Sequence, residues 1–157
     1  MEPTRVDICR LAAEVAALQI AHWGADTVTN EHRALGDLYD TMQELVDDFV
    51  EAFAGKTGIL PKTGRVVEVT VELDNAKLLS RGLALIEETR SALPASANED
   101  LLNILADMEA AYSKAKYLLK VETEHDTKAA EAAEKQVLGY ARPKKKPTTV
   151  PARDLED

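Results

Sequence analysis

The chain has 157 residues, of which 45% are hydrophobic and only 4% aromatic, and its formal net charge is −9. This length suffices for one domain with a sizeable core, and a core that is mainly aliphatic suits packed helices. The acidic balance disfavours nucleic-acid binding except through a local basic patch. The single cysteine, Cys9, excludes an internal disulfide, and we find neither a signal sequence nor an apolar run long enough to cross a membrane. We therefore expect a cytoplasmic protein.

The first part of the chain is predicted to form two helices joined by a short turn. The first covers residues 4–24, with Thr4 as its cap, and its apolar stripe ends on His22. The second is capped by Asn30, runs to about Ala54 and stops at Gly55. The two apolar stripes are Ile8, Leu11, Val15 and Leu18, then Leu35, Leu38, Met42, Leu45, Phe49 and Phe53. Because the turn is short, we expect an antiparallel helical hairpin.

The next stretch, residues 55–73, interrupts the helical pattern. It contains further glycines and Pro61, and then Val67, Val69 and Val71 alternate with polar residues. This alternation permits a short extended segment, but one strand alone cannot form a sheet. We interpret the stretch as a crossover connection or as an arm that pairs with a neighbouring subunit.

Two more helices are predicted in the second half of the chain. The third begins at Asp74 or Asn75 and ends near Leu93, and the fourth begins after Asn98 and continues to about residue 122. The connections along the chain are therefore short, long and short. This pattern predicts an all-α protein, a ferritin-like antiparallel four-helix bundle with one long crossover between its second and third helices.

Residues 123–157 differ in composition from residues 1–122, which we assign to the bundle. They form a C-terminal extension, an Ala- and charge-rich helix followed by a tail with prolines and lysines. The run Lys144, Lys145 and Lys146 is a basic patch that could contact DNA, although acidic residues follow it closely. We also consider that the tail contacts a neighbouring subunit or a different protein.

The stretch `AHWGADTVTNEHRALGDLYDTMQELVDDFVEAFAG` resembles the first two helices of Dps proteins, the DNA-binding miniferritins. A His-Trp pair closes the first helix, and a histidine about ten residues later opens `H…LYD…LVD…E`. The stretch `ANEDLLNILADMEAAYSKAKYLL` is similar to the last helix of that family. Parts of the sequence, such as `HRALGDLYD`, also resemble Dps-like proteins encoded by tailed phages. If a phage encodes the chain, we expect it in the host-cell cytoplasm or in the virion.

The resemblance implies a homo-oligomer with an iron site between two subunits. His22 and His32 match the histidine ligands from one subunit, and Asp47 and Glu51 match the carboxylate pair from the other. Imidazoles with carboxylates suit iron, with manganese or zinc as alternatives. Gly36 stands where the family has a further aspartate ligand. This departure leaves ferroxidase activity open and favours metal binding over turnover.

Plainer interpretations remain for several of these residues. Asp40 and Glu44 fit a solvated helix face, and each histidine could be a half-buried structural residue. Trp23 fits a packing residue at the hairpin or a contact between subunits. The alternative to the Dps-like function is a non-enzymatic structural or adaptor protein of a phage particle or another large assembly, in which the C-terminal extension acts as an arm.

Overall fold

The computed structural model describes residues 6–60 and 66–120 of the chain. These residues form four α-helices and one short 3₁₀ turn, and no strand forms among them. The elements are α1 (Ile8–Gly24), α2 (Asn30–Thr57), α3 (Asn75–Ser91), η1 (Ala95–Ala97) and α4 (Glu99–Leu119). The chain divides into two compact units, Met1–Thr123 and Glu124–Asp157, and the second lies outside the described residues. An all-helical, four-helix protein is therefore confirmed.

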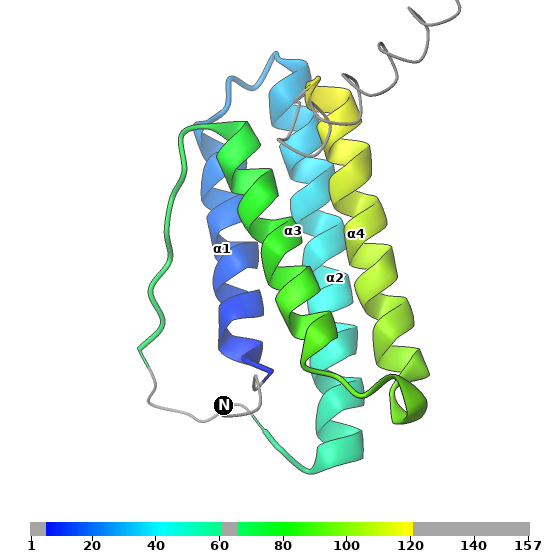
Figure 1. Ribbon diagram of the computed structural model, residues 1–157. Helices are drawn as coiled ribbons and strands as arrows, with labels where there is room; N and C mark the ends of the chain where they lie inside the picture. Colours follow the sequence, from blue (N-terminus) through cyan, green and yellow to red (C-terminus); the bar gives the residue numbers. More distant parts are fainter. Residues whose placement is uncertain (1–5, 61–65, 121–157) are drawn as a thin grey trace, which may run out of the picture. The chain divides into compact units, whose positions relative to one another are not determined.

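The four helices lie side by side (Figure 1) and all contribute side chains to one core. In Figure 1, α1 and α4 run in one direction and α2 and α3 run in the other. α2 packs against α1 and α4, and α3 packs against α4 and, less extensively, against α1. Neighbouring helices are thus antiparallel, and α2 and α3 lie diagonally across the bundle. None of the described helices is long and apolar enough to cross a membrane.

Two of the predicted helix starts are wrong, each by a different margin. α1 begins at Ile8, because the Asp7 side chain accepts a hydrogen bond from the Cys9 backbone N–H at 3.1 Å and caps the helix there. The predicted cap Thr4 lies outside the described residues. α2 is capped by Thr29 rather than by Asn30. The Asn30 side chain instead donates to the Leu118 carbonyl at 2.9 Å, so it ties the start of α2 to the end of α4.

The predicted end of α2 at Gly55 is also wrong. Gly55 lies within the helix, which ends only when Gly58 adopts the left-handed conformation with φ of 67°. A glycine stops a helix through this conformation rather than by its presence alone. In the second half of the chain, Asp74 caps α3 as predicted, with its side chain accepting from the Ala76 N–H at 2.8 Å. Asn98 precedes α4, but its side chain makes no capping bond to that helix.

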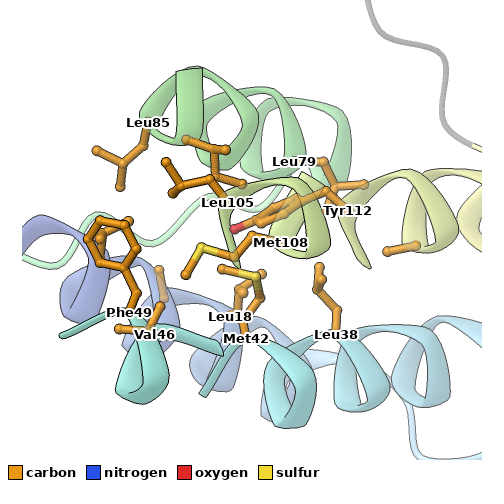
Figure 2. Packing of buried hydrophobic residues seen from close by; sticks show 14 of the residues in the cluster. Leu18, Leu38, Met42, Val46, Phe49, Leu79, Leu85, Leu105, Met108 and Tyr112 are labelled. Carbon is orange, nitrogen blue, oxygen red and sulfur yellow. The ribbon is translucent and has the colours of Figure 1, made fainter. Parts of the chain in front are cut away.

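The core consists mainly of aliphatic side chains from all four helices. Figure 2 shows side chains such as Leu18, Met42, Leu79 and Met108 converging between the helices. Most of the predicted stripe residues are buried, whereas Val15 and Leu45 are only half-buried. Residues 66–72, which precede α3, have no regular secondary structure, and Val66, Val67, Val69 and Val71 are exposed.

Candidate metal site at the corner of α1 and α2

A short turn around Asp26 joins α1 to α2. The Thr29 N–H donates to the Asp26 carbonyl at 2.9 Å, and the Val28 N–H donates to Asp26 Oδ1 at 3.1 Å. The Thr29 hydroxyl donates to the same carbonyl at 2.6 Å and accepts from the His32 N–H at 3.3 Å. These bonds in the connection hold the first helical turn of α2 beside the last helical turn of α1. This placement brings His22 and His32 together.

The two histidines form a reciprocal pair. His22 Nδ1 donates to the His32 carbonyl at 2.9 Å, and His32 Nδ1 donates to the His22 carbonyl at 3.0 Å. The ring centroids are 4.0 Å apart, and the ring planes are inclined by 32°. Both side chains are half-buried. Each ring is thus held by the backbone of the helix that carries the other.

This hydrogen bonding determines which ring nitrogen can bind a metal. A carbonyl oxygen only accepts, so each Nδ1 carries the hydrogen, and a neutral ring then has its lone pair on Nε2. Neither Nε2 makes a hydrogen bond within the described part of the chain. Metal-binding histidines commonly donate their other ring N–H to a carbonyl or carboxylate, which fixes the tautomer and orients the ring. Each histidine of the pair therefore already makes the Nδ1 hydrogen bond that commonly orients a metal-binding histidine.

Gly36 provides the space that the His22 ring occupies. A Cβ built on Gly36 would lie 2.9 Å from His22 Cε1 and 3.1 Å from His22 Nδ1. Any side chain at this position would therefore have to push the ring away from α2. The resemblance expects a carboxylate ligand at this position. Steric exclusion explains the glycine instead, because the His22 ring and a Cβ at residue 36 would occupy the same volume.

The predicted carboxylates do not join the histidines within one chain. Asp47 and Glu51 are both exposed and lie one turn apart on α2. Asp47 follows His32 by fifteen residues, which corresponds to about 22 Å along a helix. Among residues 6–60 and 66–120, no three His, Cys, Asp or Glu side chains gather closely enough to hold a metal ion. A site that combines all four residues would need a second subunit, as the resemblance implies, and it remains a prediction.

The other predicted residues are placed as follows. Asp40 and Glu44 are exposed on α2, as expected of a solvated face. Trp23 is 66% exposed, so it does not pack into the hairpin, and its role as a contact between subunits stays a prediction. Lys144, Lys145 and Lys146 lie outside the described residues.

A buried polar network that the sequence analysis missed lies in the core. Glu14 is only 6% exposed, and its carboxylate accepts from Arg81 Nε at 3.0 Å and from the Tyr112 hydroxyl at 3.4 Å. Burial raises the pKa of Glu14, and the hydrogen bond and charge of Arg81 oppose that rise. Burial also raises the pKa of Tyr112 well above its usual value, and the Glu14 charge adds to this effect. Arg81 Nη1 and Nη2 are buried without a hydrogen-bond partner among the described residues.

The comparisons with known proteins identify the family but not its activity. Residues 22–119 match a family of unknown function, DUF5856. The chain belongs to this family. The match begins at His22 and extends through α2, α3 and α4, so it includes both histidines of the corner. No curated protein and no solved structure matches the chain. The resemblance to Dps proteins is therefore still a hypothesis about this DUF5856 member.

Proposed function

We propose that this DUF5856 protein is a ferritin-like, Dps-like subunit of a homo-oligomer that binds a divalent metal ion between two subunits. Iron(II) is the primary candidate, with manganese and zinc as alternatives. The observation that carries the proposal is the reciprocal pair of His22 and His32, in which both Nδ1 protons are committed to carbonyls. Each ring is therefore held with its Nε2 lone pair free to bind a metal ion. A pair of solvated histidines at a helix end would not need this orientation.

The arrangement of the helices supports the ferritin-like part of the proposal. α2 and α3 run in the same direction, and neighbouring helices are antiparallel (Figure 1). Residues 58–74, between α2 and α3, would then be the long crossover of a ferritin-like bundle. The exposed pair Asp47 and Glu51 would supply two oxygen donors from the second subunit.

The donor set fits the proposed metals. Two imidazole nitrogens and two carboxylates suit iron(II), manganese(II) or zinc(II). In Dps proteins such a site oxidises iron(II). The glycine at position 36 removes one expected carboxylate, and the His22 ring lies in the space that this side chain would need. We therefore propose binding of the ion rather than its rapid oxidation.

A metal titration with matched variants tests the proposal. Isothermal titration with iron(II) under anaerobic conditions, or with zinc(II), should give one site per subunit in the wild type. We expect His32→Ala and Asp47→Asn each to weaken binding at least tenfold. Asp40→Asn, which removes an exposed carboxylate elsewhere on α2, should bind as the wild type does. Equal affinity in all four proteins would refute the site.

Mixing the variants tests whether the site lies between subunits. A dimer of one His32→Ala chain and one Asp47→Asn chain has one doubly defective site and one intact site. Mixing the two proteins after dissociation should therefore restore binding to a fraction of the sites. If mixing restores nothing, the two residues belong to the same site within one chain or to no site. Aerobic addition of iron(II) should produce at most a slow ferric absorbance change in the wild type.

A second candidate function is that of a non-enzymatic structural or adaptor protein in a phage particle or another large assembly. The exposed segment 66–73 favours it, with Val66 94% and Leu73 99% exposed. Among the residues that the structure describes, the backbone groups of residues 66–72 have no hydrogen-bond partner. Exposed apolar side chains and unpaired backbone groups together favour association with another chain.

Truncation distinguishes this second candidate from the first. If residues 124–157 act as an assembly arm, their removal should abolish a large assembly while circular dichroism shows a folded bundle. The remaining residues 1–123 form a compact unit by themselves. An unchanged assembly after truncation would contradict the arm, whereas intact metal binding in the truncated protein would support the first candidate.

A further inference from the structure

The outer face of α2 and α4 contains a groove of about 370 Å³. Small and aliphatic side chains line most of it, and its charged residues are Asp37, Asp107 and Lys114. The groove lies on the outside of the bundle and is separate from the histidine pair. Its chemistry is therefore that of an apolar surface with a few charges, which suits contact with another protein surface.

None of the three charged residues of the groove has an ion-pair partner in the described part of the chain, and two of them lie on α4. Asp107 and Lys114 are exposed and seven residues apart on α4, which places them on the same side of the helix about 10 Å apart. Neither side chain forms an ion pair with any of residues 6–60 and 66–120, whereas Arg10, Lys56, Arg81 and Arg90 all do. One negative and one positive group are thus both available for an external partner.

Alanines occupy the helix surface between these two charges. Ala110 and Ala111 both line the groove, and they stand midway between Asp107 and Lys114. Helices pack with their axes about 8–10 Å apart, at a distance that depends on the side chains at the contact. Methyl groups at the centre of this face allow another helix to approach closely.

We propose that this groove binds a second copy of the same chain. The two α4 helices would cross in antiparallel orientation about a point between Ala110 and Ala111. In that orientation, Asp107 of each copy faces Lys114 of the other. The interface is then isologous, because the same surface is used on both subunits and each contact occurs twice.

The order of charges along α4 supports a second copy as the occupant. An antiparallel pair matches opposite charges at both ends of the crossing, whereas a parallel pair would bring like charges together. Like charges placed against each other in an interface are costly, so the surface selects its own antiparallel copy. The inference does not depend on the metal site, since none of these residues is a proposed ligand.

Charge reversal provides the test, with native mass spectrometry in the presence of a chelator as the readout. Asp107→Lys and Lys114→Asp should each weaken the association by about tenfold or more, because each creates two contacts between like charges. The double variant exchanges both charges and should recover the wild-type distribution of masses. A mixture of the two single variants should form heterodimers in preference to either homodimer, since only the heterodimer pairs opposite charges.

Matched controls separate this interface from general charge effects and from the metal site. Asp40→Lys and Lys77→Asp make the same charge changes at exposed positions outside the groove, and both should leave the masses unchanged. His32→Ala should also leave them unchanged, so loss of the metal site would not imitate loss of this interface. Three results would each overturn the proposal: a wild type that stays monomeric, single reversals without effect, or single reversals that neither the double variant nor mixing repairs.

Discussion

Gly82→Ala is predicted to destabilise the bundle strongly, although the substitution favours helix formation. Gly82 lies inside α3, and a Cβ built on it would overlap the ring and hydroxyl of Tyr112 on α4. Tyr112 is fully buried, and its hydroxyl donates to Glu14. The ring therefore cannot move into solvent, and any shift disturbs the buried polar network.

The opposing contributions can be compared directly. Alanine in place of glycine inside a helix contributes about 0.5–1 kcal/mol of stability. Over-packing of a filled core costs about 1–3 kcal/mol, and loss of a hydrogen bond to a charged group costs about 1.5–3 kcal/mol. The steric and polar costs exceed the gain in helix propensity. We expect a net loss of about 1.5–5.5 kcal/mol in the free energy of unfolding, a large fraction of the stability of a typical domain.

Urea unfolding monitored by circular dichroism measures this loss. Gly55→Ala is the matched control, because Gly55 also lies inside a helix and a Cβ there would meet no atom within 4 Å. The control should stabilise the protein by up to about 1 kcal/mol. A Gly82→Ala variant that is as stable as the wild type, or is stabilised as Gly55→Ala is, would refute the packing of Tyr112 against Gly82.

Three further substitutions test other parts of the structure. Arg81→Met removes the group that opposes the rise in the pKa of Glu14, so the folded-state pKa should lie further above the unfolded value of about 4.5. A folded-state pKa above the unfolded one gives stability that is lost as the pH rises through the folded-state pKa. The free energy of unfolding in urea should therefore fall more steeply from pH 4.5 towards neutral in the variant than in the wild type. Parallel dependences of this free energy on pH would contradict the role of Arg81. Gly36→Ala should displace the His22 ring and weaken zinc(II) binding measured by calorimetry, and affinity equal to that of the wild type would mean that the ring is not confined there. Gly58→Ala forces a residue with a Cβ into the left-handed conformation and should lower the melting temperature by an amount that corresponds to about 1–2 kcal/mol; an unchanged melting temperature would argue against this helix end.

The sequence predicted the helices better than their ends. Apolar positions at steps of three and four are set by the chain itself, so the existence of all four helices could be predicted. The ends depend on which of several neighbouring polar residues makes the capping bond. Thr29 and Asn30 both favour helix caps, and the choice follows from the bond of Asn30 to the Leu118 carbonyl, far along the chain. Likewise, either Gly55 or Gly58 could end α2 by residue type, but only Gly58 adopts the left-handed conformation that ends it.

Long-range partners also explain why the buried network was missed. Glu14 lies on the apolar stripe between Leu11 and Leu18, at steps of three and four. A charged residue at such a position is normally assumed to face solvent, because burial of an unpaired carboxylate is costly. Its burial is made possible by Arg81 and Tyr112, which come from α3 and α4. A charged residue in register with a core stripe was the signal, but nothing local identified its partners.

The position of the His22 ring explains why residue 36 is a glycine at the proposed metal site. The resemblance predicts that the two histidines belong to one site, but it does not predict that each donates to the backbone of the other's helix. That arrangement requires the His22 ring to lie against α2, where the glycine leaves room for it. A carboxylate at this position and the observed ring position exclude each other. If the corner binds a metal, the chain therefore lacks one ligand but holds two imidazoles in fixed orientation before the ion arrives. Preorganised donors favour binding, and the missing carboxylate leaves fewer protein groups to support a change of oxidation state.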